Sequence, residues 1–203
     1  MSYSKNDVCN LALSCMGNRG SVENIDNPKK QEEIAFSKWF DISRRSALRQ
    51  LMPSFARKRD VWAMADFTPS FGYAYAYKVR SDCVRVLGLG NLYEKKNDYS
   101  VEGGYLLTNR HHPEGLPVRY VEDILDPSLY TDDFILLWAW ILADNTCMEI
   151  TNDRTMKSYV DQTLPIKIME ICGVDSQENK PIRVAHSPIL DSRHGIKRIN
   201  LKP

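Results

Sequence analysis

The stretch that decides the fold is TDDFILLWAWILAD, residues 131–144. Its large apolar side chains recur at spacings of three and four residues, a pattern that places them on one face of an α-helix. The residues of this face are Phe134, Leu137, Trp138, Ile141 and Leu142. Asp132 and Asp133 stand just before it, where carboxylates stabilise the positive end of a helix dipole. We therefore expect a helix with a deeply apolar face, beginning at Thr131.

Two further helices are predicted upstream of this stretch. The first begins at Ser4, which can form a capping box with Asp7, and ends at Gly17. The second has Asn27 as its N-cap, followed by a proline, and continues as far as Pro53. At about 24 residues and 1.5 Å per residue it would be roughly 36 Å long. A helix of that length is expected to contact other chains as well as its own core.

A fourth helix follows the central one. Thr151 or Asn152 opens it, Pro165 predicts a kink within it, and Gly173 is placed to end it. After Gly173 the helical periodicity stops, and the tail contains prolines, mixed charges and few large apolar side chains. Such a tail cannot bury enough surface to fold alone, so we expect it to become ordered on a partner.

Between the second helix and the central one, the pattern changes to a period of two. Val84 and Val86 alternate with Arg85, and Gly103-Gly104 is placed to turn a hairpin. The predicted fold class is therefore α+β, with a four-helix bundle-like body, an inserted small antiparallel β domain and an extended C-terminal arm. The expected boundaries are 1–52 for helices one and two, 53–125 for the β domain, 126–173 for helices three and four, and 174–203 for the arm.

Composition is that of a soluble globular protein. The 203 residues are 43% hydrophobic and 26% charged, and the formal net charge is +1. This charge creates no global field that would attract nucleic acid or a membrane surface. The longest apolar run, residues 134–143, is about half of the roughly 20 residues that a membrane span needs. The five cysteines are scattered and never form C-x-x-C, so we expect buried, reduced thiols in a protein made in the cytoplasm.

No arrangement of residues predicts a catalytic site, a metal site or a cofactor. His111-His112 lacks further ligands at metal-binding spacing, so we expect a solvated loop there. Asp132 and Asp133 are neighbours on a helix and do not face each other, which argues against paired catalytic carboxylates. A cell-wall hydrolase stays open as an alternative, with Asp132, Asp133 and Glu114 as the acids to test.

A DNA-binding accessory protein is the second alternative. Tyr73, Tyr75 and Tyr77 form a stripe beside Lys78 and Arg80. Aromatic side chains can stack on bases while cations hold phosphates, so the stripe could serve as a platform for nucleic acid. Tyrosine is also common on the packed face of a strand, and packing is the interpretation we favour.

Short motifs in a consistent order extend along nearly the whole chain. They are Asn10-x-Ala12-Leu13 with Gly17, Leu51-Met-Pro53-x-Phe55-Ala56, Tyr75-x-Tyr77-Lys78-Val79, Asp82-Cys83-Val84-Arg85-Val86, Arg119-Tyr120-Val121 and Ser192-Arg193-His194-Gly195. In order and spacing they resemble the head-to-tail connector adaptors of short-tailed bacteriophages, the tail tubular protein A family. Ser54 stands where many members have tryptophan, and Ser81 lies near their usual proline. The turn at Ser81 is therefore expected to differ.

The resemblance implies a structural virion protein and no enzyme. Members of the family form a dodecameric ring beneath the portal protein and extend the channel through which double-stranded DNA passes without sequence recognition. They offer a platform to the tail nozzle, of the tail tubular protein B type, and in many phages to fibres or tailspikes. We accordingly expect a homo-oligomer in the tail connector of a virion, with no cofactor and no membrane contact.

Three groups of residues are expected to make these contacts. The portal-binding arm is assigned Ile182, Arg183, Val184, His186, Pro188, Ile189, Leu190 and Arg193. The interface between ring subunits, or the channel wall, is assigned Trp39, Arg44, Arg45 and Arg49. The face of the β domain toward the nozzle is assigned Tyr93, Tyr99, Tyr105 and His111.

Overall fold

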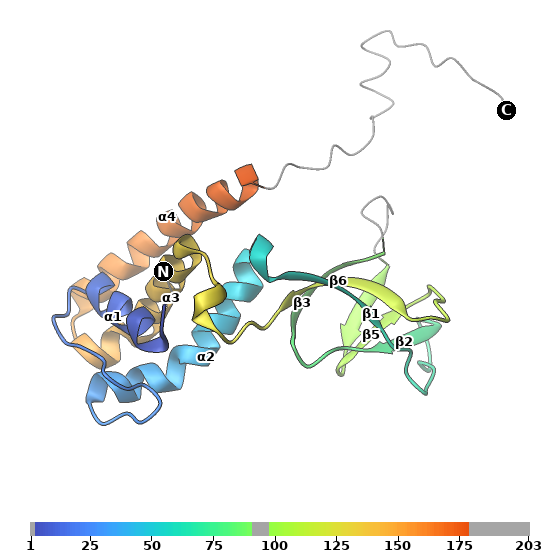
Figure 1. Ribbon diagram of the computed structural model, residues 1–203, viewed down its shortest axis with the longest axis horizontal. Coiled ribbons are helices and arrows are strands. Elements are labelled where there is room, and N and C mark those ends of the chain that lie inside the picture. Colours follow the sequence, from blue (N-terminus) through green and yellow to red (C-terminus); the bar gives the residue numbers. More distant parts are fainter. Residues whose placement is uncertain (1–2, 91–97, 179–203) are drawn as a thin grey trace, which may run out of the picture.

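The chain folds into a helical body and a smaller β domain that extends from one side of it (Figure 1). The computed structural model describes residues 3–90 and 98–178. Its described helices are α1 (Lys5–Cys15), α2 (Gln31–Leu51), α3 (Asp132–Thr151) and α4 (Arg154–Glu178). Its described strands are β1 (Arg57–Trp62), β2 (Tyr75–Lys78), β3 (Cys83–Leu89), β4 (Tyr99–Glu102), β5 (Tyr105–Thr108) and β6 (Leu116–Glu122). The predicted α+β fold is confirmed.

The central helix α3 organises the body, because α1, α2 and α4 all pack against it. Its predicted apolar face is buried, and the indole Nε1–H of Trp138 donates to Ser43 Oγ of α2 at 2.9 Å. By length and composition alone α3 could cross a membrane, but 61% of its most apolar window is buried inside the protein. Burial of that kind is typical of a helix at the centre of a packed body.

The start of α1 is as predicted, whereas α2 starts later. Ser4 N–H donates to the Asp7 carboxylate at 2.8 Å, Asp7 N–H donates to Ser4 Oγ at 3.3 Å, and Gly17 follows the helix with φ +64°. The predicted N-cap of α2, Asn27, lies outside the helix. The Glu33 carboxylate accepts two N–H groups from residues 29 and 30, which fixes the start of α2 at Gln31.

Helix α4 is longer than predicted. It continues through Gly173 to Glu178, so the prediction that Gly173 ends it is wrong. Glycine ends a helix when it adopts a left-handed backbone, and Gly173 is not among the residues with positive φ. In a helix interior it only weakens the helix, by about 1 kcal/mol relative to alanine. Any arm therefore begins after residue 178 and not at 174.

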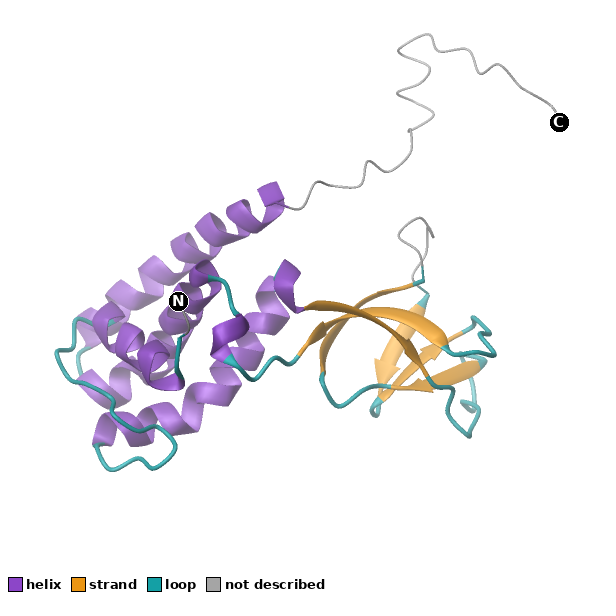
Figure 2. Ribbon diagram, viewed as in Figure 1, coloured by secondary structure: helices purple, strands orange, loops and turns teal. Residues whose placement is uncertain are grey.

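The described strands of the β domain form two three-stranded antiparallel sheets, in the orders β1-β6-β3 and β2-β5-β4 (Figure 2). The predicted turn at Gly103-Gly104 joins β4 to β5, and both glycines have the positive φ that a tight hairpin requires. Side chains from both sheets make a separate core for this domain. Its largest members are Trp62, Tyr77, Leu106, Leu116 and Tyr120.

Two neighbouring segments connect the body to the β domain. The chain leaves α2 through a 3₁₀ turn, Ser54–Ala56, and returns from β6 through a second one, Pro127–Leu129. Arg57 and Val121 pair directly where the two connections meet the sheet. Val121 is fully buried in the core of the helical body, so the base of the sheet packs as part of that body.

Candidate interaction surfaces

The junction between the domains is held by a buried arginine of α2, Arg44. Its side chain is 2% exposed, and Nη1 donates to the Asp123 carboxylate and, at 2.7 Å, to the carbonyl oxygen of Ile124. Nη2 donates to Asp41 Oδ1 at 3.2 Å. The assignment of Arg44 to a ring interface or channel wall is therefore corrected. Its charge is neutralised inside the chain, where it ties α2 to the segment that returns from β6.

The other residues assigned to the ring interface lie nearer the surface. Arg45 is well exposed, although its Nε donates to Asp123 Oδ2 at 3.0 Å. Arg45 and Arg49 line a cavity of about 410 Å³ between α2 and the start of β3. Trp39 is half-buried against the body core. Arg45 and Arg49 thus remain available for contact with another molecule.

The residues assigned to the nozzle-facing surface lie in different environments. Tyr93 lies outside the described residues. Tyr99 packs against the β-domain core, and its burial raises the pKa of its hydroxyl. Tyr105 meets Phe67 edge to face at 4.8 Å between ring centroids, and exposed His111 lies 4.8 Å from the ring of Tyr75. Tyr105 and His111 therefore sit in aromatic contacts of two different kinds at the surface of the domain.

All eight residues assigned to the portal-binding arm lie in residues 179–203, outside the described part of the chain. These residues are Ile182, Arg183, Val184, His186, Pro188, Ile189, Leu190 and Arg193. What the structure describes is the element that precedes these residues in the chain. It is the end of α4, which extends beyond the rest of the body (Figure 1).

Helix α4 has apolar side chains on two faces. Its core-facing row, at spacings of three and four, packs against the body core: Met156, Val160, Leu164, Ile168 and Ile171. Tyr159, Ile166 and Met169 lie off this row and are exposed. Ile166 and Met169 are seven and ten residues after Tyr159, so these side chains share one side of the helix. We call them the outer row of α4. Sequence reasoning missed this row, although one face cannot accommodate all of these apolar positions.

A second apolar feature lies in the loop between β1 and β2. Phe71 is 90% exposed, and Phe67, four residues before it, is also exposed. Isolated exposed apolar residues are common, but a phenylalanine with nearly all of its surface in solvent offers a large apolar side chain to a partner. The loop lies in the part of the β domain that is distant from the body (Figure 1).

The side chains considered for chemistry are dispersed. Within residues 3–90 and 98–178, no group of three or more His, Cys, Asp or Glu side chains is placed to hold a metal ion. Asp132 and Asp133 lie exposed in the first turn of α3, and Glu114 is exposed in the loop before β6. Glu114 therefore lies on a different element from Asp132 and Asp133, which are neighbours on α3 and do not face each other.

The tyrosine stripe is divided by burial. Tyr77 is fully buried, and its hydroxyl donates to the carbonyl oxygen of Arg110 and accepts the N–H of His112, each at 3.0 Å. Tyr75 packs partly against the same core. Packing, the favoured interpretation of the stripe, agrees with these contacts, because a buried Tyr77 cannot stack on a base.

No protein-family model matches the chain, and no curated protein is similar enough to match it.

Proposed function

We propose that the protein is a structural component of a virion, a head-to-tail adaptor that forms a ring between the portal and the tail nozzle. The ring would extend the DNA channel and give tail components a platform. The order of motifs along the chain supports this assignment. The structural observation that carries it is the outer row of α4, because apolar side chains grouped on the solvent side of a packed helix are typical of a surface that binds a further partner.

A ring gives the outer row such a partner. In a closed ring every subunit presents one surface to its neighbour on one side and a different surface to its neighbour on the other. Exposed apolar residues also occur on α2, where Ile34 and Ile42 are in solvent. Burying the outer row against a neighbouring subunit would remove Ile166 and Met169 from water. Each fully buried side chain of this size contributes about 2 kcal/mol.

The shape of the molecule suits an adaptor with two ends. The β domain projects away from the helical body, and α4 ends elsewhere on the body (Figure 1). In the proposed ring the bodies pack side by side, the β domains carry Phe71 toward the tail, and the arms reach the portal. Each arm after the first would bind at high effective concentration, so weak individual contacts would add to a stable assembly.

The arm is tested by truncation after Glu178. This cut leaves α4 intact, whereas removing everything after residue 173 would also delete its last turn. The truncated protein is expected to keep the melting temperature of the full chain and to lose binding to its portal in a pull-down experiment. Portal binding that survives the truncation at full strength would contradict the arm assignment.

The ring contact is tested by charging the outer row. Ile166→Asp with Met169→Asp should leave the melting temperature nearly unchanged, because both side chains are exposed. Electron microscopy of the variant mixed with portal should show no complete rings, whereas the parent should form them. The control variant, Ser21→Asp with Asn27→Asp, adds the same two charges to the exposed loop before α2 and should assemble normally. Rings of the charged outer-row variant would overturn the proposed contact.

A further inference from the structure

Two arginines face each other across the outer sheet of the β domain. Arg59 of β1 and Arg119 of β6 are direct partners in the antiparallel register. The carbonyl oxygen of Pro117 accepts the N–H of Gly90, so the odd-numbered backbone groups of β6 point toward β3. Arg59 and Arg119 therefore form a non-hydrogen-bonded pair, in which Cα atoms are only about 4.5 Å apart and side chains are closest.

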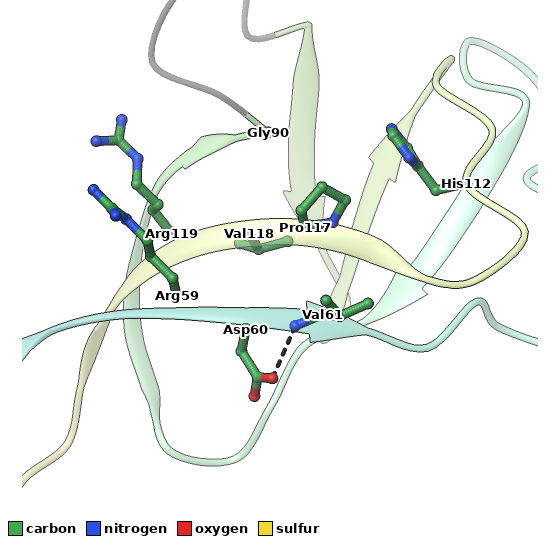
Figure 3. Close-up of a pocket in the computed structure, with 8 residues that line it drawn as sticks. All are labelled: Arg59, Asp60, Val61, Gly90, His112, Pro117, Val118 and Arg119. Atoms are coloured by element: carbon green, nitrogen blue, oxygen red, sulfur yellow. Dashed lines mark hydrogen bonds between the residues drawn. The ribbon is translucent and has the colours of Figure 1, made fainter.

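The two faces of this strand pair differ in how their charges are satisfied. On one face, Lys58 pairs with Glu122 at 2.6 Å and Arg80 pairs with Asp60 at 2.7 Å. On the other face, neither Arg59 nor Arg119 has an ion-pair partner among the described residues. Figure 3 shows both guanidinium groups extending to the same side, while Asp60 points to the opposite one. The Asp60 carboxylate therefore does not neutralise the arginine pair.

Of the two arginines, Arg119 has the less favourable environment. Its Nε is buried and has no hydrogen-bond partner in the described structure. Desolvation, with the added repulsion of Arg59 and Arg57, lowers the pKa of the Arg119 guanidinium. Like charges directly opposite each other destabilise a sheet, and an unsatisfied buried donor adds a further cost. The two arginines thus offer hydrogen-bond donors to an anion, and no carboxylate among the described residues pairs with them.

Apolar side chains lie next to the two arginines along the strands. Val61 and Pro117 are the next pair along the same face, and Val61 is 57% exposed. With Arg59, Arg119 and His112 they line a cavity of about 360 Å³ (Figure 3). A ligand here would meet cations at one end of the cavity and an apolar ledge beside them.

The edge of the sheet is the third component of the site. Strand β1 is an edge strand in the order β1-β6-β3. Because Arg59 lies in a non-hydrogen-bonded pair, its backbone N–H and C=O point away from β6, toward the open side of the strand. The next N–H group along this edge, that of Val61, already donates to Asp60 Oδ1 at 2.8 Å (Figure 3). An extended polypeptide can pair with the backbone groups of Arg59 and place alternate side chains on the same face as Arg59.

We infer that Arg59 and Arg119 together bind a carboxylate side chain of an extended acidic segment from another protein, with an apolar neighbour of that carboxylate resting on Val61 and Pro117. A guanidinium group binds a carboxylate through two parallel hydrogen bonds, and one carboxylate can accept hydrogen bonds from both arginines of the pair. A nucleic acid suits the site less well. Duplex binding draws on many phosphate contacts, and it makes no use of an open strand edge or an apolar ledge. The inference does not depend on the proposed function.

The test uses the full chain and a labelled peptide in which valine and glutamate alternate, compared with the same peptide carrying glutamine. Binding is measured by fluorescence anisotropy and by the NMR signal of the Arg119 Nε–H group. The glutamate peptide should bind and shift that signal, and the glutamine peptide should bind more weakly by roughly tenfold or more. The double variant Arg59→Gln with Arg119→Gln should lose the same factor. Arg19→Gln with Arg154→Gln, which removes two exposed charges from the helical body, should not.

A second variant separates binding from folding. Arg59→Glu places a carboxylate directly opposite Arg119. This variant should therefore have a higher melting temperature than the parent and should no longer bind the peptide. Equal binding of the glutamate and glutamine peptides would overturn the inference. So would unchanged peptide binding by the double glutamine variant. Binding of a short DNA duplex through Arg59 and Arg119, with no binding of the glutamate peptide, would reassign the pair to phosphate recognition and likewise overturn it.

Discussion

Glu33 shows how a buried carboxylate can organise a loop. It is 3% exposed in the first turn of α2, and its oxygens accept backbone N–H groups from residues 23, 24, 29 and 30 at 2.8–3.3 Å. Hydrogen bonds from the backbone of Lys29, Lys30 and Glu23 lower the pKa of Glu33 from 4.5 to about 2. One side chain therefore accepts the backbone N–H groups that precede the helix and those of the loop that leads into it.

This lowered pKa predicts a dependence of stability on pH. The stabilisation by ionised Glu33 is fully present above its unfolded pKa and is lost as the pH falls through its folded pKa of about 2. Glu33→Gln should therefore lower the melting temperature at neutral pH, and the gap to the parent should narrow between about pH 4.5 and pH 2. Thermal unfolding followed by circular dichroism at a series of pH values measures the gap. A gap that is constant down to pH 2 would count against this role for Glu33.

Arg44 predicts unequal effects for its two acidic partners. Asp123→Ala leaves the buried guanidinium without its main counter-charge, which typically costs about 3 kcal/mol or more. Asp41 is well exposed and contacts Arg44 at 3.2 Å, so Asp41→Ala should cost about 1 kcal/mol or less. Urea unfolding of the two variants provides the comparison. Equal losses would show that the Asp123 contact does not secure the junction.

For single residues, contacts between positions close together in the sequence can be predicted, whereas contacts between positions far apart in the sequence cannot. The capping pair Ser4 and Asp7 could be predicted because the two residues are three positions apart. Arg44 was misassigned because its partner, Asp123, is 79 residues away and is recognisable only once the chain has folded. The same holds for Arg59 and Arg119, which the register of two strands brings together. An arginine in isolation looks like a solvated side chain in any sequence.

Among the elements, the turn before β6 depends on a glycine that has no room for a side chain. Gly115 has φ +107°, and a Cβ there would lie 2.5 Å from Val61 Cγ1 and 3.0 Å from the carbonyl oxygen of Trp62. Gly115→Ala should cost about 3 kcal/mol, from backbone strain and the clash with β1. Gly72→Ala is the matched control. Its φ is +84° with nothing within 4 Å, so only about 1 kcal/mol of strain is expected. Chemical unfolding of both variants measures the difference.

Element types were easier to predict than element ends. The central helix and the hairpin at Gly103-Gly104 follow from strong periodicity and from a turn that requires two glycines. The end of α4 does not, because a helical glycine differs from a terminating one only in its backbone conformation. Nothing in the residue type at position 173 reveals that conformation. The apolar residues of α4 were not divided between two faces on the basis of sequence, so the outer row was overlooked.

For the whole molecule, the shared packing at the junction predicts a single unfolding transition. Val121 belongs to β6 but is buried in the body core, together with Ala56 from the other connection. Val121→Ala should therefore cost about 2 kcal/mol and should lower the stability of both domains together. Hydrogen exchange of amides in α3 and β6, with urea as the perturbant, follows each domain separately. Two transitions, with only one moved by the substitution, would show that the domains unfold independently.

The division into a body and an inserted domain was accessible from the sequence, because periodicity changes from helical to alternating and back. How the parts join was not accessible. It depends on which strands lie next to the connections, and strand order in a sheet is set by pairing across the chain.

The pairing of Arg57 with Val121 has a consequence for the history of such chains. The two ends of the β domain lie side by side. The two points at which the domain joins the helical body are therefore no farther apart than two paired strands. A gene could gain, lose or exchange the coding sequence between those ends in one recombination event while the helices keep their packing. A short loop in place of residues 57–121 would reconnect α2 to α3. Related bodies carrying unrelated inserts at this point are what such a join permits.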